Sequence, residues 1–216
     1  MVVKQHRSVT LERRRFVQGG VCLAMVSGLP FRAAAQTQSV SWGLQLVNAA
    51  RSQIGVTIRY DGAYASLKFP GGDIPREVGV CTDVIIRAYR DAFDYDLQLA
   101  VNTDMSRNFG AYPRKWSLRR PDRNIDHRRV PNLQTFFRRK GAALGAASSP
   151  ESYQPGDLVT QMISGRLPHI GIVSDRRAAS GRFMLIHNIG AGAQEEDVTA
   201  SFPVTGHYRF KPPKIS

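Results

Sequence analysis

The pattern of apolar and polar positions predicts helices in the first half of the chain. Residues 41–54, "SWGLQLVNAARSQI", place apolar side chains at helical spacing. Residues 81–93 carry an apolar stripe at the i, i+3, i+4 spacing, and Cys81 lies on that stripe. Two further helices are expected over 98–109 and 132–140. The first half is therefore expected to supply four amphipathic helices.

The second half of the chain has the pattern of strands. After a small-residue loop, short segments rich in apolar and β-branched residues are separated by turn residues. The predicted strands are "DLVTQMI" (157–163), "HIGIVSD" (169–175), "RFMLIHNIG" (182–190) and "HYRFK" (207–211), with one short strand earlier at 57–60. Because helices precede strands without alternation, we expect an α+β fold, with helices packed on one face of an antiparallel sheet.

The first 35 residues have the layout of an export signal. A basic cluster at 13–15 precedes a short apolar run at 19–29, and small residues follow at 33–35. The run is shorter than the roughly 20 residues that span a bilayer. The paired arginines before Phe-Val resemble a twin-arginine signal; an ordinary export signal and a basic tail are the alternatives. We expect removal of 1–35, a periplasmic or secreted protein without a membrane span, and one domain over 36–216.

The charge of the chain favours an anionic partner. The formal net charge is +13, and residues 36–216 keep 24 basic against 16 acidic residues. A positive surface attracts anions without naming one. For an exported protein we expect peptidoglycan or another anionic cell-envelope polymer, and no nucleic acid. The alternative is that the charge serves solubility alone. We expect a monomer and no cofactor.

The cysteine count directs attention to one thiol. Cys22 lies in the export segment, where it is a filler or, alternatively, a lipid-anchor residue. Removal of that segment leaves Cys81 without a disulfide partner in its own chain. An unpaired thiol in an oxidising compartment indicates a reactive group or intermolecular pairing, whereas a buried inert cysteine is the alternative. At a helix start the partial positive charge is expected to favour the thiolate, and free N–H groups can hold an oxyanion.

Two histidines occupy strand positions that suit thiol catalysis. His169 opens one predicted strand and His187 ends the next. Residues on paired strands lie only about 5 Å apart, so the two side chains can be neighbours. If the helix that begins at Cys81 packs on that sheet, His169 can act as base with His187 orienting it. The three residues are the candidate catalytic set.

Metal binding is a second interpretation of the histidines and aspartates. No H-E-x-x-H or C-x-x-C spacing occurs in the chain, so we expect no metal site. The ligands on that interpretation would be Asp126, His127, His169, His187 and His207.

Several motifs resemble known families. "GVCTDVIIRAY" and "YQPGDLVTQM…LPHIGIVSD…FMLIHN" resemble the core of the NlpC/P60 cell-wall cysteine peptidases. More closely, residues 57–210 resemble exported bacterial proteins of domain-of-unknown-function family 1287, through "FPGGDIPREVGVCTDVIIRAYR", "RPDRNIDHRRVPNL" and "PHIGIVSD". That family is assigned to the same clan, so the resemblance implies a papain-like NlpC/P60-type fold. The chain departs from NlpC/P60 enzymes in a helical and basic insert at about 94–152. It implies Cys81 as nucleophile, His169 as base and acid, and His187 as orienter.

The resemblance also extends to weaker site assignments. The candidates for oxyanion or substrate contacts are Tyr60, Thr82, Asp83, Asp126, His127, Arg128 and Asn188. Asp83 in the first helical turn suits the helix dipole equally well. The basic run 120–131 either grips substrate carboxylates or forms a solvated loop held by its own aspartates. This chain has Thr82-Asp83 where NlpC/P60 enzymes usually have Ser-Gly.

The leading functional hypothesis is an exported thiol hydrolase that cleaves an amide bond, most naturally in peptidoglycan stem peptides. A thiol acyltransferase would use the same residues and differ in its acceptor. A protein that binds the cell wall without catalysis, on the same fold, is the alternative from another functional class. Binding alone would need no thiolate.

Overall fold

A computed structural model describes residues 41–145 and 152–213. The chain divides into two compact units, Met1–Gln38 and Ser39–Ser216, and the described residues belong to the second. The expected export segment, 1–35, lies outside the described residues. Within the described ranges, no helix combines the length and the apolar character that crossing a membrane requires.

The four helices predicted from the apolar pattern are present. They are α1 (Trp42–Arg51), α2 (Cys81–Phe93), α3 (Leu97–Asn108) and α4 (Val130–Arg139), with short 3-10 turns at Phe109–Ala111 and Asp126–Arg128. The bounds of α2 agree with the prediction from its stripe. Helix α1 ends three residues before the expected position, because the chain turns there towards β1.

The second half forms one antiparallel sheet with the strand order β6-β5-β4-β3-β7. Its strands are β3 (Leu158–Ile163), β4 (Leu167–Arg177), β5 (Phe183–Asn188), β6 (Ala193–Glu196) and β7 (Val204–Tyr208); β1 (Arg59–Tyr60) and β2 (Val78–Gly79) form a separate parallel pair. Two expectations need correction. Strand β6 was not predicted, because "AQEE" has no apolar alternation, and β7 begins at Val204 rather than His207, because pairing with β3 sets its position.

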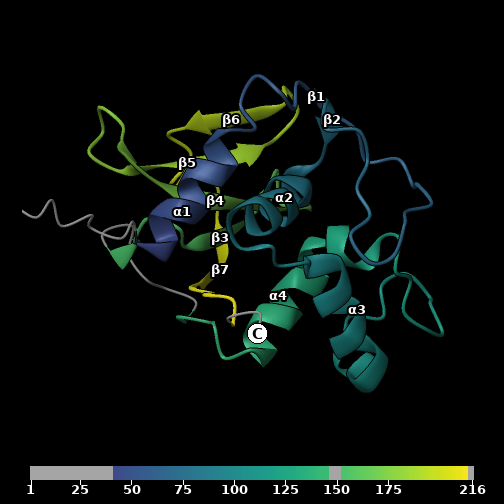
Figure 1. Ribbon diagram of the computed structural model, residues 1–216. Helices are drawn as coiled ribbons and strands as arrows, with labels where there is room; N and C mark the ends of the chain where they lie inside the picture. The colour runs from purple at the N-terminus through teal and green to yellow at the C-terminus, as the bar shows by residue number, and fades with distance from the viewer. Residues whose placement is uncertain (1–40, 146–151, 214–216) are drawn as a thin grey trace, which may run out of the picture. The chain divides into compact units, whose positions relative to one another are not determined.

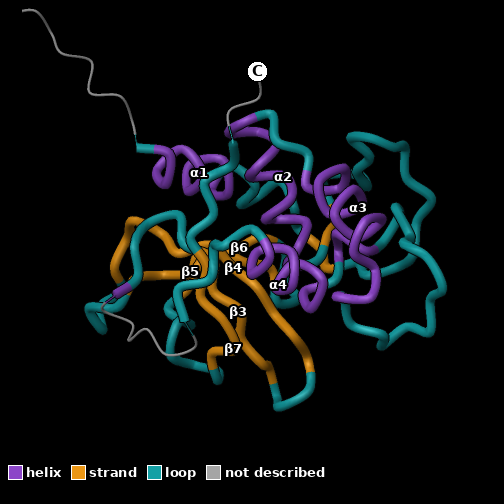
Figure 2. The backbone as a smooth tube through the Cα atoms, turned by 90° about the horizontal axis from the view of Figure 1, so that it is seen from below, coloured by secondary structure: helices purple, strands orange, loops and turns teal. Residues whose placement is uncertain are grey.

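Helices gather on one face of the sheet (Figures 1 and 2). Helix α2 packs on β4 and β5, and α1 and α4 also contact β4. Alternate strand residues such as Ile170 and Ile172 enter the main core with Ile85 of α2. The opposite face carries a smaller cluster that includes Val173 and Leu185. The predicted α+β class is therefore confirmed, and the helix that begins at Cys81 lies against the strands that carry the histidines.

Candidate active site

Cys81 is the first residue of α2, and a buried ion pair holds the turn that presents it. Asp83 Oδ2 accepts a 2.7 Å hydrogen bond from the backbone N–H of Val80. Arg128 donates to both oxygens of the same carboxylate, each at 2.9 Å. The side chains of Asp83 and Arg128 are 4% and 2% exposed. Both were candidates for substrate contact, and the structure uses both to fix the helix start.

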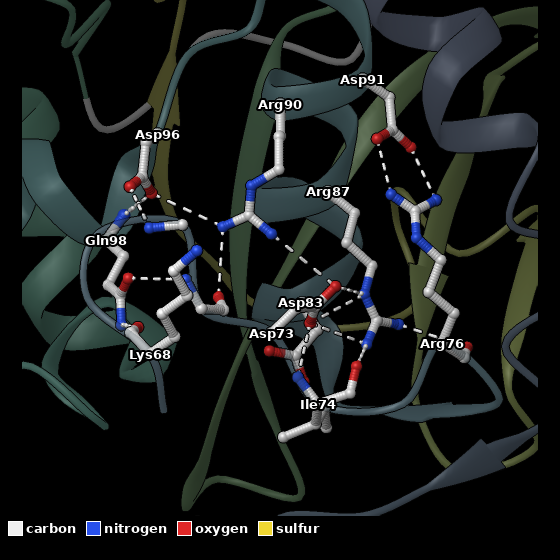
Figure 3. Close-up of polar contacts among 12 residues, drawn as sticks. Lys68, Asp73, Ile74, Arg76, Asp83, Arg87, Arg90, Asp91, Asp96 and Gln98 are labelled. Carbon is white, nitrogen blue, oxygen red and sulfur yellow. Dashed lines mark hydrogen bonds and ion pairs between the residues drawn. The ribbon is translucent and has the colours of Figure 1, made fainter. Parts of the chain in front are cut away.

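A second buried arginine fixes the loop that leads into this turn (Figure 3). Arg87 of α2 is fully buried and donates to Asp73, with Nε 2.9 Å from Oδ2. It also donates to Thr57 Oγ1 and to four backbone carbonyls, those of Ile74, Pro75, Arg76 and Val78. The five N–H groups of this guanidinium are shared among these acceptors, so one buried side chain holds the backbone before Cys81 in place.

Asn188 connects β5 to the same turn. Its Nδ2 donates to the backbone carbonyl of Gly79 at 2.9 Å, and its Oδ1 accepts from the N–H of Gly190 at 3.1 Å. A Cβ at Gly79 would lie 3.2 Å from that of Asp83 and from Arg87 Nη1, so the turn packs tightly here. Asn188 therefore positions the turn before Cys81 through the backbone.

The two candidate histidines contact each other. His169 Nε2 lies 3.0 Å from His187 Nδ1, and the rings meet edge to face with centroids 5.0 Å apart. The register of β4 and β5 explains the contact, because Ile172 pairs with Ile186. His187 then falls opposite Gly171, and His169 is its diagonal neighbour on the same face. Both side chains are buried.

The thiol of Cys81 lies against β4 at the residue that follows His169. The sulfur accepts a hydrogen bond from the backbone N–H of Ile170, the next residue along β4. Among the described residues, no hydrogen bond joins the sulfur to His169. Strand alternation places Ile170 towards the main core and His169 on the opposite side. A hydrogen bond between the thiol and His169 would therefore have to form when substrate binds, as catalytic hydrogen bonds often do.

Burial reverses the ionisation that was expected for the thiol. Loss of solvent raises the pKa of Cys81 to about 12; the Asp83 charge adds to the rise, and backbone N–H groups oppose it. The helix start therefore lowers the thiol pKa as predicted, but burial raises it by more. Burial also lowers the pKa of His169 to about 3, with His187 contributing. The resting pair is consequently a neutral thiol beside a neutral imidazole.

Alkylation of Cys81 by iodoacetamide is expected to be slow at neutral pH and to rise about tenfold per pH unit from 7 to 10. The thiolate is the reacting form, and with a thiol pKa of about 12 its fraction grows in that proportion. Intact-mass measurement on a chain carrying Cys22→Ser isolates this thiol. An alkylation rate that has already reached its plateau below pH 7 would instead show a thiolate–imidazolium pair. That result would contradict a resting state with a neutral thiol and a neutral imidazole.

Cys81 lies on the wall of a pocket of about 380 Å³. Tyr60 lines the same pocket, because β1 pairs with β2 and sets Tyr60 opposite Gly79. Burial raises the pKa of the Tyr60 hydroxyl, and the neighbouring Cys81 is the next cause. Of the weaker candidates, Tyr60 and Arg128 line this pocket. Tyr60 is the one whose side chain is not already buried in an ion pair. The lining is completed by Gly62, Val80, Lys115, Trp116, Ile125, Arg128, Arg129, Val130, Pro131, Arg166 and Pro168.

The pocket lining is basic and contains no carboxylate. Two of its cations are already paired, Arg128 with Asp83 and Arg129 with Asp126 at 2.9 Å. The Arg129 guanidinium also lies 4.0 Å from the centre of the Trp116 ring. The side chains of Lys115 and Arg166 are exposed and have no ion-pair partner in the described part of the chain. Two exposed positive charges therefore border the pocket.

Three weaker candidates lie away from the pocket lining. The Thr82 hydroxyl donates to the carbonyl of Arg128. Asp126 accepts from the N–H of Asp122 and from Asn132, which supports the prediction of a loop held by its own aspartates. His127 is buried, and burial followed by the nearby Arg128 lowers its pKa to about 4. These side chains support the fold around the site.

Sequence reasoning missed one residue at the histidine pair. Glu196 of β6 places Oε2 3.1 Å from Nε2 of His187. No local pattern could have revealed it, because the contact depends on a strand that was not predicted. His207, a ligand on the metal interpretation, pairs instead with Asp157 at 2.7 Å. Within the described ranges, no group of three His, Cys, Asp or Glu side chains converges as a metal site.

These features define an α+β domain with a cysteine at a helix start and two buried histidines in contact, and the cysteine bonds to the strand that carries one of them. The chain belongs to the family described as "Domain of unknown function (DUF1287)", whose model matches residues 47–210. It is 53% identical over 167 residues to the Escherichia coli (strain K12) protein named "Uncharacterized protein YijF", a match that covers 77% of this chain and 81% of that protein.

Two solved structures are similar to the chain at low identity. NlpC1 from Trichomonas vaginalis matches with a TM-score of 0.38 and 14% identity over 79% of this chain. NlpC2 from the same organism matches with a TM-score of 0.40 and 12% identity over 81%. The match spans about half of each of those proteins, 48% in both cases.

Proposed function

We propose that this protein is a thiol hydrolase that cleaves an amide bond, with peptidoglycan stem peptides as its substrate. One observation carries the proposal. The thiol of Cys81 stands at a helix start on the wall of a pocket. Its sulfur accepts a hydrogen bond from Ile170, the residue that follows His169 of the His169–His187 pair. A purely structural cysteine needs neither the pocket nor the buried histidines.

The chemistry begins with proton transfer. Both groups are neutral at rest, so His169 takes the thiol proton as Cys81 attacks the amide carbonyl carbon. The C–S bond forms and the carbonyl electrons move to oxygen. The tetrahedral intermediate then collapses, the C–N bond breaks, and His169 returns the proton to the departing amine. Water, activated by the same histidine, cleaves the thioester and restores the thiol.

Two groups are available to hold the oxyanion. The backbone N–H groups of the first turn of α2 point from the helix start, where the dipole favours negative charge. The Tyr60 hydroxyl lines the same pocket and can donate a further hydrogen bond. Donors of this kind contribute about 3–4 kcal/mol each to the transition state.

The charge of the pocket supports an anionic substrate. Lys115 and Arg166 line the pocket as exposed cations that have no ion-pair partner among the described residues. Stem peptides of peptidoglycan carry carboxylates next to their amide bonds, and Arg binds carboxylates with matching geometry. The basic run 120–131 thus contributes less to recognition than its sequence suggested, since Arg128 and Arg129 are already paired. The export-signal pattern of residues 1–35 supports a periplasmic or secreted location, where this polymer is found.

A non-catalytic binding module is the second candidate, and one observation favours it. The thiol is buried, its pKa is raised to about 12, and it forms no hydrogen bond to His169 within the described residues. A surface that only holds an anionic wall polymer needs the basic pocket and not the thiolate.

The test compares the chain with its Cys81→Ala variant on purified peptidoglycan, with soluble fragments analysed by mass spectrometry. The proposal expects new fragments from the parent protein only, and their masses identify the cleaved bond. Equal fragments from both proteins would contradict the role of Cys81. Retention of both proteins on the polymer without fragments would establish the binding module instead.

A further inference from the structure

A chain of polar contacts leads from His169 to a carboxylate on β6. His169 Nε2 contacts His187 Nδ1 at 3.0 Å, and His187 Nε2 lies 3.1 Å from Glu196 Oε2. The His187 side chain is fully buried, whereas that of Glu196 is 42% exposed. Among the described residues, Nε2 of His187 has no other partner, and its alignment with the carboxylate falls short of a straight hydrogen bond. Glu196 is therefore the acceptor within its reach.

The positions of the protons in this chain are not independent. A neutral imidazole carries one N–H, and the other nitrogen is an acceptor. Two neutral histidines joined Nε2 to Nδ1 therefore have two arrangements. Either His169 Nε2–H donates to His187, or His187 Nδ1–H donates to His169.

Only the first arrangement lets His169 act as a base. When His169 carries its proton on Nε2, its Nδ1 is free to accept the proton of the Cys81 thiol. In the second arrangement Nδ1 carries the proton and cannot accept another. A carboxylate beside Nε2 of His187 favours a proton there, because an ionised carboxylate is acceptor only. His187 Nδ1 must then accept, and His169 must donate to it.

We propose that Glu196 is a positioning residue that selects the base-competent tautomer of His169 through His187. It touches no substrate and acts through two imidazoles. The catalytic meaning of this role rests on the proposed function, but the tautomers themselves do not.

The neighbouring glutamate provides a matched control. Successive strand residues point to opposite faces, so Glu195 faces α1 rather than the histidines. Its carboxylate pairs with Arg51 at 2.9 Å and with Arg176 at 3.0 Å. Glu195→Gln therefore disturbs the same strand and another set of contacts while leaving His187 alone.

The test is ¹⁵N NMR of histidine-labelled full-length protein, with Glu196→Leu, Glu196→Gln and Glu195→Gln variants. The chain has five histidines, so single substitutions assign the signals. We expect the parent protein to carry protons on Nε2 of both His169 and His187. Glu196→Leu is expected to redistribute the His187 proton, Glu196→Gln to retain the parent pattern in part through its carbonyl, and Glu195→Gln to retain it fully.

Two results would overturn the proposal. One is a parent protein with its proton on Nδ1 of His187. The other is a Glu196→Leu variant that remains folded and keeps the parent tautomers. The NMR readout needs no substrate, so expected tautomers without any cleavage would uphold the positioning role and refute only the proposed function. With cleavage, Glu196→Leu is expected to lower kcat about 10- to 100-fold at unchanged KM, as loss of an orienting partner does elsewhere.

Discussion

His169→Ala is expected to slow amide cleavage by about 10²–10⁴-fold, the usual contribution of a positioned general base. The variant keeps Cys81 on the pocket wall and removes the group that takes the thiol proton. Because burial raises the thiol pKa to about 12 and lowers that of His169 to about 3, no preformed thiolate is left to compensate at neutral pH. The initial rate of fragment release from peptidoglycan measures the effect, and added imidazole should restore part of it.

His127→Ala is the matched control for that variant. His127 is also a buried histidine whose pKa burial lowers, to about 4, but it does not line the pocket. Its replacement should reduce thermal stability without changing the rate for the folded protein. Equal losses of rate in the two variants would mean that His169 acts through the fold and not as the base.

Arg87→Met is expected to lower the free energy of unfolding by about 3–5 kcal/mol, the range for breaking a buried ion pair from one side. The substitution retains apolar volume and removes every donor of the guanidinium. Asp73 loses its 2.9 Å partner, and the carbonyls of Ile74 and Val78 lose the donor that Arg87 supplies. The carbonyls of Pro75 and Arg76 keep the Val78 N–H and the Thr57 hydroxyl as donors. Buried acceptors left unpaired cost most of their desolvation energy. Urea unfolding followed by circular dichroism measures the change.

Arg76→Met is the control, because it removes an arginine from the loop that Arg87 holds. Arg76 forms two hydrogen bonds with Asp91, but its side chain is 44% exposed. Figure 3 shows this pair at the margin of the cluster. Exposed pairs typically contribute about 0–1 kcal/mol. If the two variants were equally stable, the buried network around Arg87 would not be what holds the loop before Cys81.

The elements with a strong periodic pattern could be predicted from sequence. The apolar stripe of α2 set its bounds, and the spacing of His169 and His187 on neighbouring strands predicted their contact. Both predictions depend on local geometry, which repeats with a fixed period along a helix or strand. The α+β class followed from the order of the same elements.

The features that depend on distant parts of the chain could not be predicted. The helix start suggested a lowered thiol pKa, but burial among β4 and α2 residues has the larger effect. Arg128 looked available for substrate, yet it bonds Asp83 from 45 positions away. Glu196 reaches His187 only because β6 pairs with β5, and "AQEE" gives no strand pattern. In each case the deciding partner lies on another element.

The pocket wall contains two kinds of charged residue, exposed ones and ones that hold the fold, and this difference affects how such proteins can diversify. Lys115 and Arg166 are exposed side chains that form no ion pair with other described residues, whereas Arg128 and Asp83 hold the turn before Cys81. Exposed positions of the first kind usually tolerate substitution within about 0.5 kcal/mol. Substitution at these two positions can therefore change the charge of the pocket while Cys81 and both histidines stay in place, so two proteins with the same three residues need not bind the same ligand.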